Sequence, residues 1–512
     1  MFDFHLHPSL KAQFADPSRK PAPWEDLHLR FRNPDLMLRL LRCQGINEVI
    51  DSQASMTQVA RAGMNLVAIT LHPPEAAMMR DPLIQKIAAE AQTPFIHPKQ
   101  VARIAGGDAC FELLNEELAH LLEYREGNGY RLKLIRSMDE YDAGDTRTIH
   151  AVLNIEGAHA FEGIRTGRNS EERWRTYWEN FTEFTTARGV RIFAMNIAHL
   201  EPNECCNHAF GIQVFRPEPF YPTGCGITPM GVRLLHQMRD QGILCDIKHT
   251  SLLARQQLYA LGLHGDGWPL VCTHAGLTGI HSNERTRYIR SQTKLKKDFL
   301  HLRHSKPAGY LEGTSFNASS INLYDDDVAE VVLSGGLIGL SLDQRILGTP
   351  EQTQLSGSYT DELYDEEVIS PEERDFFLTG TGRYAGPEAV SSWQHISTRD
   401  RQEPRYFHAR HFLNQVFHLF RIADRYSIPC ERMAQQICIG SDFDGLIDPL
   451  NACRTVLELP AFRNDLLNEF VSWERAYTAA TGQSISTSIP PDELLENIFY
   501  ANGVRFMRAW YT

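Results

Sequence analysis

Short apolar runs rich in Val, Ile and Leu recur along the chain, separated by stretches in which apolar residues follow a helical spacing. Such runs are typical of parallel strands that are buried on both faces and joined by crossover helices. Eight of them can be placed, at 2–7, 65–71, 151–156, 191–197, 243–249, 270–274, 336–342 and 437–442. The pattern therefore predicts an α/β fold, the (β/α)8 TIM barrel.

Two of the predicted helices have clear boundary signals. Before the fifth strand, Thr228 suits an N-cap, Pro229 the first helical position and Gly242 the C-terminal stop. The last helix starts at 490–492 with two prolines and an aspartate, and we expect it to run toward Gly503. This C-terminal helical segment is predicted to pack beneath the barrel.

Two stretches, about 280–320 and 348–405, break the alternation of strands and helices. The second contains SGSYTDELYDEE and TGTGRYAGPE, which are rich in turn formers and acids. Because they follow the sixth and seventh strands, both are expected to be insertions over the C-terminal mouth, where barrel enzymes build their sites. Since barrels often run long, residues 1–512 are predicted to form a single domain.

Composition narrows the class of partner. The 512 residues carry 51 Lys and Arg against 64 Asp and Glu, a formal net charge of -13, which disfavours nucleic acid and anionic membranes. A small-molecule substrate agrees better with this charge than a nucleic acid or a membrane surface does. The start MFDFHLHPSL has no signal-peptide pattern and no apolar stretch is long enough to span a bilayer, so a cytoplasmic location is expected.

The ten cysteines are scattered, as expected of reduced thiols rather than of a disulfide framework. The adjacent pair Cys205 and Cys206 could suggest a metal site. Neighbouring thiols rarely share one ion with good geometry, so this interpretation is disfavoured.

Polar residues that could bind a metal gather at the ends of the predicted strands. His5 and His7 are two residues apart on the first strand, so both imidazoles should point to one side and could chelate one ion. Glu156 ends the third strand, where a buried carboxylate needs a partner. The alternatives are two surface histidines near a terminus and a salt bridge between Glu156 and an arginine.

The fifth strand ends in CDIKHT and the sixth in VCTHAG, which places His249 and His274 at equivalent heights. A single histidine at a strand end is more often a satisfied polar group than a ligand. Four at matching strand ends favour a metal site. Imidazole and carboxylate ligands favour zinc, with iron, manganese or cobalt left open.

Three further residues are expected at the mouth: His199 after the fourth strand, and Asp442 and Asp444 in GSDFDG after the eighth. A carboxylate beside an activated water can accept its proton and return it to a leaving group, and Asp442 is the preferred candidate. The alternative is that GSDFDG is a turn stabilised by its aspartates. His159 is expected to be structural.

Several ordered motifs between residues 2 and 506 resemble the membrane dipeptidase family, also called renal dipeptidase, of the amidohydrolase superfamily. The motifs are HLH, IEGAHAF, GVRIFAMNIAH, GITPMGVRLLHQMRDQGILCDIKHTS, PLVCTH, GSDFDG and ANGVRF. The resemblance implies two zinc ions, one held by His5 and His7 and the other by His249 and His274, with Glu156 as the bridge.

The same resemblance implies that zinc-activated water attacks the peptide bond of a dipeptide. His199 would bind the substrate and steady the oxyanion, while Asp442 would manage the proton. It also implies a homodimer.

Three positions depart from the family pattern. His7 stands where the family has Asp, and Lys248 stands where it has Ser and is expected to point away from the ions. Ile321 stands in place of the arginine that holds the substrate carboxylate. Arg285 is the preferred replacement for that arginine, before Arg287 and Arg290 of HSNERTRYIR.

The leading functional hypothesis is therefore a zinc-dependent metallopeptidase that hydrolyses the peptide bond of a dipeptide. The loss of the positioned arginine keeps open a barrel hydrolase for another amide, an ester, a lactone or a phosphoester. A non-catalytic metal-binding protein is the third reading, which the retained Asp442 disfavours.

Overall fold

The structure is a computed structural model. It describes residues 1–31, 49–92, 96–107, 109–163, 170–187, 189–211, 217–290, 294–349, 351–352, 359–360, 366–379 and 404–512.

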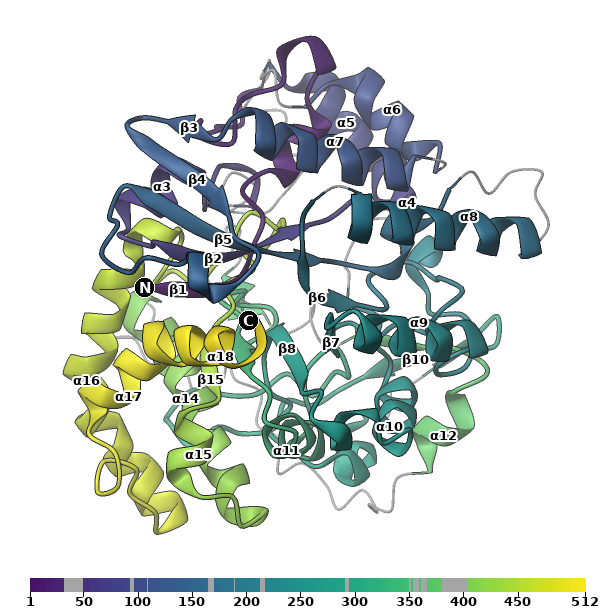
Figure 1. Ribbon diagram of the computed structural model, residues 1–512. Coiled ribbons are helices and arrows are strands. Elements are labelled where there is room, and N and C mark those ends of the chain that lie inside the picture. Colours follow the sequence, from purple (N-terminus) through teal and green to yellow (C-terminus); the bar gives the residue numbers. More distant parts are fainter. Residues whose placement is uncertain are drawn as a thin grey trace.

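The centre of the molecule is a parallel barrel whose strands are paired in chain order (Figure 1). All eight predicted strands are present, which confirms the TIM-barrel prediction. They are β1 (Phe2–Leu6), β2 (Leu66–Leu71), β5 (Thr148–Ile155), β6 (Ile192–Asn196), β7 (Leu244–Asp246), β8 (Leu270–Ala275), β11 (Ile338–Leu340) and β15 (Ile437–Ile439). Each consists wholly of buried residues, as expected of strands covered on both faces.

The first and last strands meet beyond the end of β15. Leu6 forms a parallel bridge with Phe443, and the backbone N–H of Asp442 donates to the carbonyl of His5 at 2.9 Å. The buried carboxylate of Asp3 accepts the N–H groups of His5 and Ser441, at 3.1 and 3.0 Å. These contacts join β1 to the segment after β15 and bring both segments to the same end of the barrel.

Helices surround the strands (Figure 1). They are α3 (Met56–Arg61), α4 (Ala76–Arg80), α5 (Pro82–Glu90), α6 (Pro98–Ala105), α7 (Cys110–Glu123), α8 (Ser170–Thr182), α9 (Pro229–Asp240), α10 (Leu252–Ala260), α11 (Asp325–Leu333), α12 (Arg374–Leu378), α14 (Pro404–Arg425), α15 (Cys430–Ala434), α16 (Leu459–Thr481), α17 (Pro491–Glu496) and α18 (Asn502–Trp510). The predicted start of α9 is confirmed, because the Thr228 side chain accepts the N–H of Gly231.

The last helix does not end near Gly503 as expected. A π-helical turn at Asn497–Ala501 links α17 to α18, which continues to Trp510. A Cβ atom on Gly503 would lie 2.1 Å from the Phe2 ring, so this glycine permits close packing of α18 on the start of β1. The packing beneath the barrel is therefore as predicted, but Gly503 serves a close approach instead of a helix stop.

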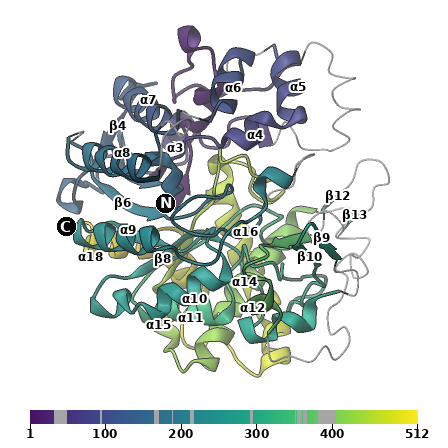
Figure 2. The same ribbon diagram turned by 90° about the vertical axis from the view of Figure 1, so that its right-hand side faces the viewer.

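The two predicted insertions pair with each other. β9 (Lys294–Lys296) and β10 (Phe299–Arg303) form an antiparallel sheet with β14 (Glu366–Ile369), and β12 (Glu351–Gln352) pairs with β13 (Tyr359–Thr360). In Figure 2, β9 and β10 lie on the side of the molecule opposite to α18. Val368 of β14 packs with Phe210 and Phe220, beside Met78 and Leu200.

Residues 380–403 of the second insertion lie outside the described residues, and the expectations of a single domain and of a covered mouth stay predictions.

An extra strand pair, β3 (Glu126–Gly127) with β4 (Tyr130–Leu134), extends the barrel sheet beside the start of β5.

Within the described ranges, none of the helices has both the length and the apolarity needed to cross a bilayer. The cysteines in these ranges, Cys205 and Cys206 among them, are free thiols. The homodimer and the cytoplasmic location stay predictions.

Candidate metal centre

His5 and His7 come together at the end of β1. His7 follows directly after the strand, and both side chains are buried. Their Nε2 atoms lie 3.0 Å apart. The spacing of two residues along an extended chain therefore brings both imidazoles to the same side, as the sequence predicts.

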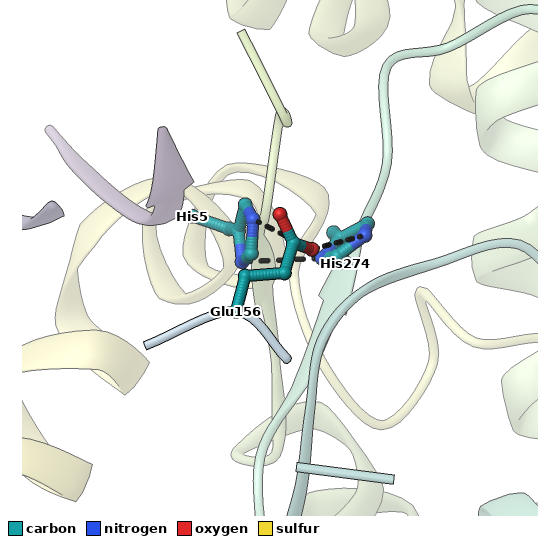
Figure 3. Close-up of side chains that lie close together, drawn as sticks. All are labelled: His5, Glu156 and His274. Atoms are coloured by element: carbon teal, nitrogen blue, oxygen red, sulfur yellow. Dashed lines mark hydrogen bonds and ion pairs between the residues drawn. The ribbon is translucent and has the colours of Figure 1, made fainter. Parts of the chain in front are cut away.

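Glu156, the first residue after β5, faces this pair. Its Oε1 lies 3.5 Å from His5 Nε2, and its Oε2 lies 3.4 Å from His7 Nε2. Figure 3 shows His5, Glu156 and His274 converging from three different segments. No arginine approaches Glu156 within 4.0 Å among the residues that the structure describes, so the salt-bridge alternative finds no support.

His249 and His274 form a second pair, which adjoins the first, since His274 Nδ1 lies 3.1 Å from His5 Nδ1. The Nε2 atoms of His249 and His274 lie 3.1 Å apart, at 3.3 and 3.6 Å from Glu156 Oε1. His274 lies within β8, whereas His249 lies three residues beyond the end of β7, so the predicted fifth strand is too long. His249 has φ +66°, a strained value for a residue with a Cβ atom, as is often found at functional sites.

The donor set fits divalent metal ions. Nitrogen ligands about 2.0–2.1 Å from a tetrahedral zinc ion lie roughly 3.3 Å apart, close to the spacing within both histidine pairs. Glu156 Oε1 and the Nδ1 atoms of His7 and His249 are buried and have no hydrogen-bond partner within the described part of the chain. The carboxylate oxygen in particular calls for a cation in a site this deeply buried.

A chain of contacts fixes the ring of His5. Its Nδ1 lies 2.8 Å from Thr273 Oγ1, and this hydroxyl makes a short hydrogen bond to the buried carboxylate of Asp246. Asp246 also accepts the backbone N–H of Lys248 at 3.0 Å. Contacts of this kind orient an imidazole and leave its Nε2 lone pair for a metal.

Burial lowers the pKa of His249 and of His274 well below the ordinary value, because a charged imidazolium would lose its solvation. Positive charge on His199 and on His5, respectively, acts in the same direction. The neutral imidazole is the form that binds a metal.

Electrostatic attraction between the carboxylates and the histidines opposes the effect of burial on their pKa values. Burial would raise the pKa of Glu156, but the charges of His199 and His5 hold it well below its usual range. Burial would lower the pKa of His7, but hydrogen bonds to Asp442 and Glu156 raise it to about 10. The carboxylates thus concentrate negative charge at the position where a bound cation would neutralise it.

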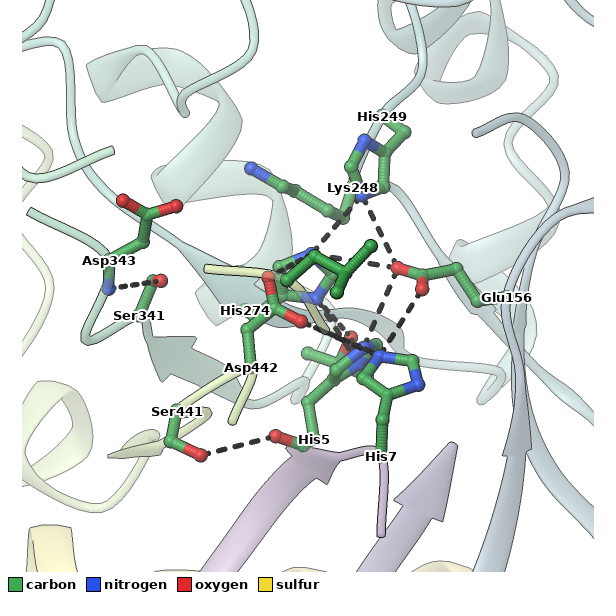
Figure 4. A network of polar contacts seen from close by, with 12 residues as sticks. His5, His7, Glu156, Lys248, His249, His274, Ser341, Asp343, Ser441 and Asp442 are labelled. Atoms are coloured by element: carbon green, nitrogen blue, oxygen red, sulfur yellow. Dashed lines mark hydrogen bonds and ion pairs between the residues drawn. The ribbon is translucent and has the colours of Figure 1, made fainter. Parts of the chain in front are cut away.

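Asp442 lies at the edge of the same group (Figure 4). Its Oδ1 lies 3.5 Å from His7 Nε2 and 3.9 Å from His5 Nε2, and its side chain is 16% exposed. Like His249 it has a positive φ, +64°. It is therefore both close to the histidines and accessible from the pocket.

Asp444, the other acid of GSDFDG, has a structural environment. Its Oδ1 accepts from Lys11 Nζ at 2.6 Å and from the N–H of Gln53 at 2.8 Å, and its Oδ2 accepts the N–H of Ala54 at 2.9 Å. Only Asp442 of the two lines the pocket over the histidines.

A second buried group adjoins the centre, and two of its three members, Glu75 and His72, were not predicted from the sequence. Glu75 makes a very short contact with His199 Nδ1 and lies 3.1 Å from His72 Nε2. His199 Nε2 faces Glu156 Oε1 at 3.6 Å, as the expected position at the mouth requires. His72 directly follows β2 and could have been found by the same strand-end rule as the ligands.

The neighbouring His159 supports this group. Its Nε2 lies 2.9 Å from the carbonyl oxygen of Pro73, and burial lowers its pKa to about 4. The structural role that the sequence suggests for His159 stays a prediction.

The pocket above the centre has charged and apolar walls. Lys248 lines it, and its side chain extends away from Glu156, in the direction that the sequence predicts (Figure 4). The reason for this direction differs from the expected strand alternation, because β7 ends at Asp246 and the Lys248 ammonium donates to the carbonyl oxygen of Ile321. The apolar wall includes Ile321, Ile346 and Ile447.

Arg285 lies elsewhere. Its guanidinium donates to the carbonyl groups of Ser282, Phe376 and Phe377, at 2.6 to 2.9 Å, and it is not among the residues that line the pocket. Arg287 is half exposed and pairs with Glu284 at 3.1 Å. The structure therefore places neither arginine beside the histidines.

Comparison with known proteins yields structural neighbours only. No protein family model matches the sequence, and no curated protein matches it. A metallo peptidase from Rhodobacter sphaeroides, solved with a phosphinate mimic of the dipeptide L-Ala-D-Ala, is similar at 17% identity and TM-score 0.46, over 99% of this chain and 98% of that one.

A second metallo peptidase, described as dipeptidase AC, gives 16% identity and TM-score 0.44 over 93% and 96% of the two chains. The probable dipeptidase PvdM from Pseudomonas aeruginosa gives 12% and 0.42 over 90% and 89%. At such low identity, function has to be argued from the side chains of the site.

Proposed function

We propose that the protein is a metal-dependent hydrolase that cleaves a C–N bond, and that its substrate is a dipeptide. One observation carries the proposal: four buried imidazoles converge on Glu156, beside a pocket that Glu156, His249, His274 and Asp442 line. Ligands without an adjacent proton acceptor would serve a structural ion equally well. The acid at the rim favours catalysis.

The two histidine pairs would hold two zinc ions, with Glu156 shared between them. His5 and His7 form one pair, and His249 and His274 the other. Divalent ions, when bound here, would lower the pKa of water and polarise a carbonyl group. Other divalent transition metals suit the same ligands.

Asp442 and His199 would act on the substrate from different sides of Glu156. Asp442 would accept a proton from the attacking water and deliver it to the leaving nitrogen. His199 would place Nε2 beside the substrate carbonyl oxygen and stabilise the negative charge that develops there. Glu75 holds the opposite ring nitrogen and so fixes the direction of Nε2.

Glu75 is therefore a positioning residue. We expect Glu75→Ala to lower kcat by about tenfold to a hundredfold while the metal content and KM change little, because a loss of support leaves the ligands in place. Glu75→Gln, which retains an acceptor oxygen, should restore much of kcat. Steady-state kinetics and elemental analysis would measure both. If the two variants lose metal and thermal stability together, Glu75 has a structural role only.

A second candidate function is hydrolysis of another amide, an ester or a lactone. The observation that favours it is Ile321, an apolar residue on the pocket wall that cannot bind a carboxylate. A non-catalytic metal-binding protein remains the third alternative.

The test is a hydrolysis screen of metal-loaded and chelator-treated protein on dipeptides with L and D residues, with esters and lactones alongside. We expect dipeptide cleavage that is lost on chelation and restored by zinc. Cleavage of the esters or lactones alone would put the second function first. Metal binding without any hydrolysis would contradict the proposal.

A further inference from the structure

We propose that Lys248 binds the free carboxylate of the substrate. This inference rests on the proposed function, since it assigns the substrate's anionic end to one wall of the same pocket. Lys248 lines that pocket, is 1% exposed and directly precedes the candidate ligand His249.

The contacts of Lys248 leave its ammonium group without a directly paired carboxylate. Its Nζ donates to the carbonyl oxygen of Ile321 at 3.1 Å, and among the described residues no carboxylate oxygen lies within 4.0 Å of Nζ. An ammonium group has three N–H donors, so the hydrogen bond to Ile321 leaves the other N–H groups available to a substrate. A buried cation without an anionic partner is unfavourable, and a bound carboxylate would supply that partner.

The direction of the side chain suits this role. Figure 4 shows Lys248 extending away from Glu156, on the side of the site where Asp343 lies. A substrate could therefore place its scissile bond at the histidines and its carboxylate at Nζ. The bond to the Ile321 carbonyl holds the ammonium in place before the substrate arrives.

The other cation on the pocket wall is already paired. Arg345 forms a two-point ion pair with Asp343, with Nε 2.9 Å from each carboxylate oxygen and Nη2 2.5 Å from Oδ2. It also donates to the carbonyl oxygen of Leu446 at 3.3 Å. A substrate carboxylate would have to displace Asp343 to reach Arg345, whereas Lys248 offers its donors directly.

The test compares a dipeptide with its C-terminal amide, because only the free acid presents a negative charge. A charge-assisted hydrogen bond contributes enough to make the acid bind roughly tenfold to a hundredfold better than the amide. Binding would be measured by calorimetry with reduced-bond analogues, in which –CH2–NH– replaces the peptide bond and no hydrolysis can occur. Hydrolysis of the parent acid and amide gives kcat and KM.

We expect wild-type protein to prefer the acid, Lys248→Met to lose the preference, and Lys248→Arg to retain part of it. In Lys248→Met the KM for the acid should rise more than the KM for the amide, and melting temperature and metal content would show that the variant is folded and loaded. Arg285→Met tests the residue that the sequence suggests, and loss of the acid preference there instead would overturn the assignment.

Equal binding of acid and amide by wild-type protein would also overturn the role of Lys248. This outcome is distinct from failure of the proposed function, in which neither the acid nor the amide is hydrolysed. If hydrolysis fails but the analogue binds with an acid preference that depends on Lys248, the anion site stands without the peptidase activity.

Discussion

Asp442→Asn is expected to retain the bound metals and to lower kcat by about 10²- to 10⁴-fold, the range for loss of a general acid–base group. The amide has nearly the same shape as the carboxylate but cannot accept the proton from water. The four histidines and Glu156 remain as ligands. Elemental analysis and steady-state kinetics on the same preparation would separate the two effects.

Asp444→Asn is the matched control, because it makes the same chemical change two residues away. Asp444 pairs with Lys11 and accepts two backbone N–H groups, so its loss should lower the melting temperature more than kcat. A large kcat effect in the folded Asp444→Asn protein would mean that it, rather than Asp442, is the catalytic acid. Loss of metal from Asp442→Asn would make Asp442 a ligand.

Glu156→Gln is expected to reduce the metal content from close to two equivalents to less than one, because a single residue faces both histidine pairs. An amide oxygen is a weaker ligand than a carboxylate oxygen. The substitution also removes the negative charge that balances the cations. Activity should fall with the metal. Elemental analysis after dialysis against metal-free buffer would measure the loss.

Glu474→Gln provides the control for removal of a buried glutamate. Glu474 lies on α16 and accepts the backbone N–H groups of Ile485 and Ser486, far along the chain from every candidate ligand. Its variant should keep the metal content of wild type. If Glu156→Gln also keeps two equivalents, Glu156 does not bridge two ions.

Much of the centre could be predicted from the sequence because parallel strands carry their own signal. Runs such as LVAITL and LVCTHA are apolar throughout, and the fold places their C-terminal ends together. The residues that follow those runs, among them Glu156 and Asp442, therefore meet at one place. The order of the strands in the barrel brings these residues together, and the conformation of the segments between the strands is not needed for this prediction.

The parts that could not be predicted depend on contacts without local periodicity. Glu75 lies in a loop after β2, and nothing in LHPPE indicates which histidines it reaches. The pairing of β10 with β14 joins two segments that are separated along the chain by α11 and β11. A sequence rich in turn formers gives no pattern from which the register of such a pairing could be predicted. The fifth strand was predicted too long, because the apolar signal extends past Asp246, where the hydrogen-bonded strand ends.

The bridge between Leu6 and Phe443 has a consequence for how the protein is made. His5 and Asp442 lie on the two segments that this bridge joins. A nascent chain whose eighth barrel strand has not yet been synthesised therefore cannot assemble the complete centre. Ions that bind only the assembled centre will stabilise the closed barrel over any partly folded form. Metal uptake during refolding would then report the final step of ring closure, so its rate can be compared directly with the rate at which secondary structure appears.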